Sequence, residues 1–239
     1  MALRSSTTLF GLLLFAGGLS LQAGSYAVKP VRIELSSRQL RTTFQVENLG
    51  DEPVTVQAHV VAWNANGGEE IQAENDEILL NPPIFSVLPG HQQYIRLGMR
   101  KPRPDTSEST FRLILEEVPP APKPGVNGLR TLLRISVPIF FKPKVSAPHL
   151  VWSAKHGAGD GMVLSVSNSG NAHVQIRRFS VTDVASGAVS QVQGSASYVL
   201  QQGKKEWTIH NSELANATKI VVQAQTDNGD IHEELVPSP

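Results

Sequence analysis

Residues 129–143 constrain the fold most strongly, because their side chains alternate with a period of two. One set of positions is apolar apart from a single threonine and consists of Leu129, Thr131, Leu133, Ile135, Val137, Ile139 and Phe141. The intervening positions include Arg130, Arg134, Ser136 and Pro138. This alternation predicts one long β-strand with an apolar face.

The same strand has two properties of an unpaired sheet edge. It is about twice as long as a typical strand, and Pro138 has no N–H group to donate to a neighbouring strand. Natural proteins shorten, charge or cover their sheet edges, because an exposed apolar edge pairs readily with another chain. We therefore predict that residues 129–141 pair with a strand of a partner protein.

The rest of the chain has the pattern of an all-β protein. Short alternating segments, separated by turns rich in Gly, Asn, Ser and Pro, follow one another to the C-terminus. Residues 144–148 lack the alternation and lie between two prolines, which predicts a short, stiff domain boundary. We expect two β-sandwich domains, residues 24–146 and 147–239.

Three local predictions concern the first of these domains. Residues 54–63 predict a strand that ends in a turn at residues 64–68. The acidic residues that follow, up to Glu77, predict a solvated loop. Residues 110–118 predict another strand, on which Arg112 is a cation among mostly apolar neighbours and needs an anionic partner.

The N-terminus has the order of regions found in a secretory signal peptide. Arg4 precedes an apolar run at residues 9–21, and Leu-Gln-Ala stands before Gly24. We expect residues 1–23 to be removed by cleavage after Ala23. No later segment approaches the roughly 20 apolar residues of a membrane-spanning helix, so we expect a soluble mature protein of about 215 residues.

Composition excludes several classes of function. The chain has no cysteine, so disulfides, thiol catalysis and thiolate metal sites are excluded. Basic and acidic residues number 21 each, and removing Arg4 with the signal peptide leaves 20 against 21. This near-neutral balance gives no overall positive potential that would attract nucleic acid or anionic lipid. The seven histidines lack paired metal-ligand spacing, and there is no phosphate loop or Gly-x-Ser-x-Gly motif. We expect no enzymatic activity, no metal and no cofactor.

Five motifs resemble those of periplasmic chaperones of the chaperone-usher pathway, which assembles pili and fimbriae. In chain order they are Asn81-Pro82-Pro83, Leu88-Pro89-Gly90, Phe111-Arg112-Leu113, Glu117-Val118-Pro119-Pro120 and Ile139-Phe140-Phe141-Lys142-Pro143. The resemblance spans nearly the whole mature chain. It implies an all-β fold of two immunoglobulin-like β-sandwich domains in a boomerang arrangement, and a location in the periplasm.

The resemblance also implies a way of binding. Chaperones of this family lend the last strand of their first domain to a pilus subunit that lacks its own final strand, and an outer-membrane usher then replaces it. The expected partners are therefore pilus subunits and an usher, and the lent strand is residues 129–141. Its lent side chains are expected to be Leu129, Thr131, Leu133, Ile135 and Val137.

The family also anchors the subunit's C-terminal carboxylate with an arginine on the first strand and a lysine late in the lent strand. Arg32 matches the arginine, but Pro138 stands at the lysine position and cannot bind a carboxylate. Arg112 is the candidate replacement, because a guanidinium binds a carboxylate through two hydrogen bonds. Alternatively, Arg112 pairs with an internal glutamate such as Glu47 or Glu116. The departure at Pro138 and the absence of cysteine look like the archaic branch of the family.

Two other classes of function remain open at this point. A secreted immunoglobulin-like adhesin or carbohydrate-binding protein could use the apolar edge for dimerisation. A hydrolase on a β-sandwich is a more distant alternative, because the chain offers no catalytic motif. A chaperone could also cover its free edge by self-association.

Overall fold

The computed structural model describes residues 26–66, 68–101, 103–120, 131–157, 161–192 and 197–239. All their regular secondary structure is β, and they contain no helix long and apolar enough to cross a membrane. The expected signal peptide and Leu129 lie outside the described residues.

The first domain is a sandwich of two sheets. One sheet has the order β1-β3-β8-β6, and the other has the order β2-β10-β9-β4-β5 with β7 paired to β4. The strands are β1 (Tyr26–Lys29), β2 (Ile33–Leu35), β3 (Arg41–Asn48), β4 (Val54–Asn66), β5 (Glu69–Glu74), β6 (Ile78–Asn81), β7 (Ile84–Val87), β8 (Gln92–Met99), β9 (Ser109–Glu117) and β10 (Arg134–Phe141). Alternate side chains from both sheets fill the core between them, including Phe44, Val46, Val56, Ile95, Leu97, Phe111, Leu113, Ile139 and Phe141.

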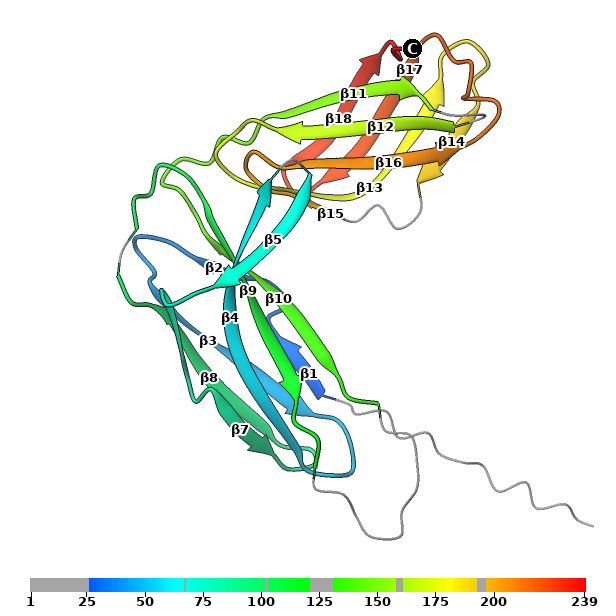
Figure 1. Ribbon diagram of the computed structural model, residues 1–239. Helices are drawn as coiled ribbons and strands as arrows, with labels where there is room; N and C mark the ends of the chain where they lie inside the picture. The colour runs from blue at the N-terminus through cyan, green and yellow to red at the C-terminus, as the bar shows by residue number, and fades with distance from the viewer. Residues whose placement is uncertain (1–25, 67, 102, 121–130, 158–160, 193–196) are drawn as a thin grey trace, which may run out of the picture.

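The second domain is a smaller sandwich with its own core. Its sheets have the orders β11-β12-β16 and β14-β13-β17-β18, and β15 pairs with β13. The strands are β11 (Leu150–His156), β12 (Gly161–Asn168), β13 (Val174–Asp183), β14 (Val189–Val192), β15 (Ser197–Val199), β16 (Lys204–His210), β17 (Ile220–Thr226) and β18 (Gly229–Leu235). The two sandwiches meet at an angle (Figure 1), so the expected all-β fold of two sandwich domains is confirmed.

The linker between β10 and β11 is held by the turn after β12. Asn171 in this turn accepts a hydrogen bond from the amide of Ala147 at 2.8 Å and donates to the carbonyl of Val145 at 2.9 Å. A Cβ atom on Gly170 would lie against backbone atoms of the linker, including the carbonyl oxygen of Ala147. Glycine at this position therefore lets the linker approach the second domain closely.

The β4–β5 hairpin differs from the sequence-based prediction. Strand β4 continues to Asn66 and β5 begins at Glu69, so the turn is shorter than the predicted residues 64–68. The predicted acidic loop is wrong for residues 69–74, which form β5. The hairpin projects from the first domain toward β15 and β16 of the second (Figure 1). There Ala65 approaches Gly203 so closely that a Cβ on this glycine would come within 3.1 Å of the Ala65 Cβ. Contact with the second domain stabilises a hairpin whose residues alone predict a loop.

Candidate functional site

Strand β10 has one fully paired edge and one mostly open edge. On one side β9 pairs with all eight of its residues. On the other side β2 pairs in parallel with residues 139–141 only. Among the described residues, no strand pairs with residues 134–138 on that side. The prediction of an unpaired edge is therefore confirmed for residues 134–138, although the described strand is shorter than predicted.

Backbone groups of β10 alternate between the two edges. The amide of Glu117 donates to the carbonyl of Leu133 at 3.0 Å, so the odd-numbered residues form the hydrogen-bonded pairs with β9. The N–H and C=O groups of Arg134 and Ser136 therefore face the open edge. Pro138 offers only its C=O group there. An incoming strand would find a short row of donors and acceptors that ends at Pro138.

The predicted lent side chains differ in accessibility. Thr131 is exposed, whereas Leu133 and Ile135 are half-buried and pack at the rim of the domain's own core. Val137 is only 2% exposed and lies inside this core. Its expected insertion into a partner does not fit this burial, because Val137 already packs against its own domain. Leu129 lies outside the described residues.

Tyr26 fixes the start of β10 to the first domain. Its hydroxyl lies 3.0 Å from the carbonyl oxygen of Leu115 and 3.2 Å from that of Leu133. Burial, together with the negative charges of Glu117 and Glu116, raises the pKa of the Tyr26 phenol from 10.0 to about 12. The neutral phenol is thus the form that the fold favours.

Tyr26→Phe is expected to remove the loss of folding stability that wild type shows at alkaline pH. The folded pKa of about 12 lies above the ordinary value of 10.0, so the stabilisation is complete below pH 10 and is lost as pH rises from 10 to 12. The lost hydrogen bond is worth about 1 kcal/mol. Urea unfolding across this range should show wild type losing its advantage over Tyr26→Phe, while Tyr94→Phe, at an exposed tyrosine, follows wild type. A difference that stays constant up to pH 12 would contradict this role.

Arg112 is held on the outer face of the sheet, beside β10. Its guanidinium lies 3.7 Å from the ring centroid of Trp63, and Nη1 donates to Ser136 Oγ at 3.2 Å. Nη2 forms an ion pair with Glu70 Oε2 at 3.1 Å. The other oxygen of Glu70 lies 2.6 Å from Nζ of Lys205, which belongs to the second domain. Arg112 thus takes part in a polar contact between the two domains.

The internal partner of this arginine is Glu70, and neither glutamate named as its alternative partner pairs with it. Glu47 pairs with Lys29 at 3.1 Å, and Glu116 pairs with Arg134 at 2.9 Å. The error follows from treating the acidic segment as a solvated loop. As part of β5, Glu70 is brought across the hairpin to β9.

Several donors converge on the Glu70 carboxylate. The indole Nε1 of Trp63 donates to Oε2 at 2.8 Å, in addition to the two cations. Burial raises the pKa of the Glu70 carboxyl, but the hydrogen bond and charge of Lys205, the bond from Trp63 and the charge of Arg112 outweigh this and hold the pKa below its ordinary value. Glu70 is therefore the ionised centre of the cluster.

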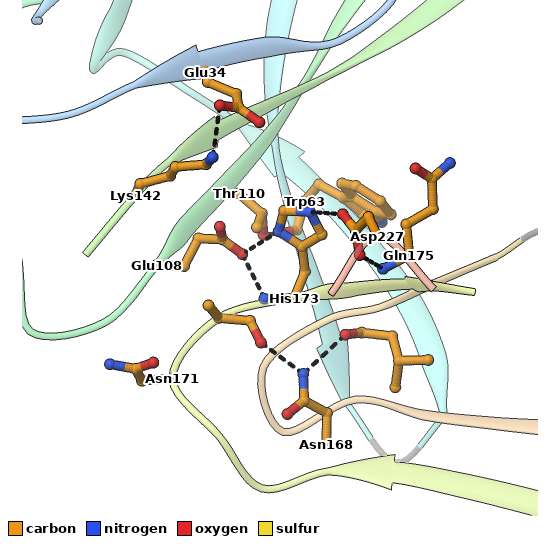
Figure 2. A network of polar contacts seen from close by, with 12 residues as sticks. Glu34, Trp63, Glu108, Thr110, Lys142, Asn168, Asn171, His173, Gln175 and Asp227 are labelled. Atoms are coloured by element: carbon orange, nitrogen blue, oxygen red, sulfur yellow. Dashed lines mark hydrogen bonds and ion pairs between the residues drawn. The ribbon is translucent and has the colours of Figure 1, made fainter. Parts of the chain in front are cut away.

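Arg32 serves as a second contact between the domains. Its guanidinium forms an ion pair with Asp227 Oδ2 at 2.9 Å and another with Glu34 at 2.6 Å. Glu34 is also paired with Lys142 at 2.6 Å, as Figure 2 shows. Burial lowers the pKa of Arg32, but the bonds and charges of Glu34 and Asp227 outweigh it and leave the pKa raised. Arg32 is therefore already engaged by two carboxylates.

Aromatic packing joins the domains between these two ion-pair groups. The ring of Phe140 stacks on His173 at a centroid distance of 3.6 Å and lies 5.3 Å from Tyr198. Glu108 Oε2 accepts from the His173 amide at 2.8 Å and lies 2.8 Å from its ring Nδ1 (Figure 2). Trp63, Phe140 and Leu200 form a small buried cluster of their own at this junction. Side chains of both domains thus make one continuous contact.

Asp227→Asn is expected to loosen the docking of the two domains while each sandwich stays folded. The change removes the charge that attracts Arg32, but leaves Oδ1 able to accept from the Gln175 amide, which it does at 2.8 Å. We expect a loss of about 1–2 kcal/mol and a broader distribution of domain orientations in X-ray scattering. Asp230→Asn, at an exposed site on the same hairpin, is the control and should leave both the stability and the X-ray scattering unchanged. Identical scattering from both variants and wild type would contradict the role of Asp227.

Sequence reasoning missed most of the residues that complete the site. The sequence predicts a solvated loop at Glu70. Lys205, Asp227 and His173 carry no local signal, because their partners lie in the other domain. Among the described residues no group of three His, Asp or Glu side chains could hold a metal ion.

The comparison with known families identifies the chain. The profile of pili and flagellar-assembly chaperones, PapD N-terminal domain, matches residues 25–146, just over half of the 239 residues. The chain belongs to this family. The match contains the whole first domain and therefore the open edge of β10 and Arg112.

One individual protein that is similar to this chain is also named as a chaperone. Chaperone protein FanE of Escherichia coli is 27% identical over 111 residues, which cover 44% of this chain and 49% of FanE. The chain therefore spans about half the length of this relative.

Solved structures extend the likeness in fold to both domains. A chain of the CsuC–CsuE chaperone–tip adhesion subunit pre-assembly complex, from archaic chaperone-usher Csu pili of Acinetobacter baumannii, has a TM-score of 0.66 and 22% identity. This match covers 90% of the present chain and 100% of that chain. A chain of the Salmonella enterica SafA pilin complex with the SafB chaperone has a TM-score of 0.62 and 20% identity, covering 89% and 97%.

Proposed function

We propose that this protein is a chaperone that binds pilus subunits by lending them strand β10. The observation that carries the proposal is the open edge at residues 134–138 in a family member whose β10 is fully paired with β9 on its other side. A subunit lacking its final strand can pair with this edge through the backbone groups of Arg134 and Ser136. Membership of the family favours this function over that of an adhesin or a carbohydrate-binding protein.

Apolar side chains at the rim supply the affinity. Leu133 and Ile135 are half-buried, so a subunit that covers the edge would complete their burial and share a core with the first domain. Full burial of such side chains contributes about 1.5–3 kcal/mol each, less for the part already covered. Thr131 belongs to the proposed set, as does Leu129 by sequence. We leave Val137 out of the proposed set, because it already packs in the core of its own domain.

The anchor for the subunit's C-terminal carboxylate is proposed to be Arg112 rather than Arg32. Both arginines are ion-paired within the chain, but Arg32 faces two carboxylates and Arg112 faces one. Arg112 also contacts Ser136 on β10, next to the proposed path of the subunit. Arg112→Ala should therefore lower the yield of the complex far more than Arg38→Ala, at an exposed arginine.

The same function sets the expected partners and location. We propose that residues 1–23 export the protein to the periplasm, where it delivers subunits to an outer-membrane usher without enzymatic activity or cofactor. The proline at the family's usual lysine position, together with the archaic Csu complex among the structural neighbours, supports the archaic branch.

Hydrogen exchange of single amides tests the proposal directly. Co-expression with a cognate pilus subunit should give a one-to-one complex. In it, the amides of Arg134 and Ser136, which face the open edge, should become protected. The amides of Ile135 and Val137 already face β9 and serve as internal controls. A stable complex in which Arg134 and Ser136 exchange as in the free protein would refute strand lending.

A further inference from the structure

The surroundings of Glu70 form a site built for a carboxylate. Three donors from different strands point at one carboxylate group: Trp63 Nε1 at 2.8 Å, Arg112 Nη2 at 3.1 Å and Lys205 Nζ at 2.6 Å. Charge-assisted bonds of this kind are the strong class of protein hydrogen bonds. The arrangement of the donors, rather than the glutamate itself, defines the site.

Two of these donors, Trp63 and Arg112, are held in place by contacts other than Glu70. The Trp63 side chain is fully buried in the junction cluster with Phe140 and Leu200. Arg112 is fixed between the indole ring and Ser136 Oγ. Removing the glutamate side chain should therefore leave a pre-formed pocket rather than a collapsed one.

The charge balance of the cluster favours an anion. Two cations, Arg112 and Lys205, face the single carboxylate of Glu70, and their side chains are only 20% and 25% exposed. The Nε atom of Arg112 is buried and has no hydrogen-bond acceptor within the described part of the chain. Without Glu70 the site would hold two facing cations, an unfavourable arrangement that an external carboxylate would relieve.

Glu70 is the member of this cluster that an external carboxylate can replace most easily. Glu70 lies on β5, the outermost strand of its sheet, whose six residues are all exposed. Its side chain is 31% exposed. An incoming carboxylate can displace it by rotation of side-chain bonds alone.

We propose that Trp63, Arg112 and Lys205 form a carboxylate-binding site between the two domains, which Glu70 fills in the free protein and the subunit's C-terminal carboxylate takes over on binding. The second half of this proposal rests on the proposed chaperone function. Glu70 thus acts as an internal place-holder that keeps the two cations neutralised and the domains joined until a subunit arrives. It also lowers the affinity for a subunit by competing for the same donors.

Chemical rescue with a small carboxylate tests the site without any subunit. Glu70→Ala removes one methylene and the carboxylate, and propionate supplies a carboxylate on a short alkyl chain in their place. In ¹⁵N–¹H spectra of Glu70→Ala, propionate should shift the indole N–H resonance of Trp63 saturably. Neutral propionamide, or sodium chloride at the same ionic strength, should have at least tenfold less effect. The other two tryptophans, Trp152 and Trp207, report on the integrity of the fold.

Matched variants make the result specific. Wild type and Glu69→Ala, which loses an exposed carboxylate from the same strand, should respond at least tenfold more weakly than Glu70→Ala, because Glu70 still occupies the site. Adding Arg112→Gln to Glu70→Ala should abolish the response. If Glu70→Ala does not fold, Glu70→Gln is titrated in its place. Equal shifts with propionate and propionamide would overturn the site.

Subunit binding tests the take-over. Glu70→Ala should bind a subunit with a native C-terminus about tenfold more tightly than wild type does. A subunit extended at its C-terminus by two glycines should bind Glu70→Ala and wild type equally well. Equal affinities for both subunits, with Arg134 and Ser136 protected as usual, would overturn the take-over and leave the chaperone function intact. Failure of strand lending would leave the propionate result standing.

Discussion

Ile135→Glu is expected to lower the affinity for a pilus subunit at least 100-fold. Ile135 lies at the rim of the core beside the open edge, where a paired subunit would enclose it. A glutamate there places an unpaired charge in an apolar contact, at a cost of several kcal/mol. A 100-fold loss corresponds to only about 2.7 kcal/mol, so the estimate is a lower bound. Isothermal titration or co-purification with the subunit measures it.

The matched control is Leu132→Glu. Leu132 is a neighbouring leucine that is already 42% exposed, so a charge there leaves the rim of the core intact. Thermal unfolding of both variants separates loss of binding from loss of folding, and Leu133→Glu provides a second rim variant. Strand lending through these side chains is wrong if Ile135→Glu and Leu132→Glu bind the subunit equally well.

Much of the first domain could be predicted from the sequence, because its determinants are local. A period of two identifies β10, and the missing N–H of Pro138 indicates an edge without any knowledge of neighbouring strands. The alternating pattern does not show which apolar residues of β10 are left partly exposed and which are buried in its own domain. Val137 and Ile135 share one face of the strand, but only Val137 lies far enough inside the sandwich to be fully buried.

The site itself could not be predicted, because its contacts join distant parts of the chain. Lys205 and Glu70 are 135 positions apart, and Arg32 and Asp227 are 195 positions apart. Such pairs depend on how two separate sandwiches dock, and no periodicity within either one encodes that. A single local signal existed for Glu70: the run 69–74 alternates well enough to pair with β4, but its charges favoured a loop.

Arg32 illustrates how a residue matched by resemblance acquires another role. It occupies the position of the family's first anchor, yet here it joins Glu34 to Asp227 across the domain boundary. The same ring that its guanidinium faces, Phe140 at 5.7 Å, stacks on His173 of the second domain. The C-terminal end of β10 therefore also lies at the domain junction.

Phe140→Ala is expected to cost about 3–5 kcal/mol of stability and to release the domain orientation. Phe140 is fully buried, and its ring contacts His173, Tyr198 and Trp63, so its loss leaves a cavity that both domains line. Urea unfolding measures the stability. Small-angle X-ray scattering should show a wider range of domain orientations than in wild type.

Phe141→Ala is the control that separates the two effects. Phe141 is equally buried but packs inside the core of the first domain, away from the junction. We expect a similar loss of stability from Phe141→Ala with scattering that matches wild type as long as the protein remains folded. If Phe140→Ala costs less than about 1 kcal/mol, or if both variants scatter alike, the aromatic junction does not set the orientation. The ion pairs of Arg32 and Glu70 would then have to hold the domains by themselves.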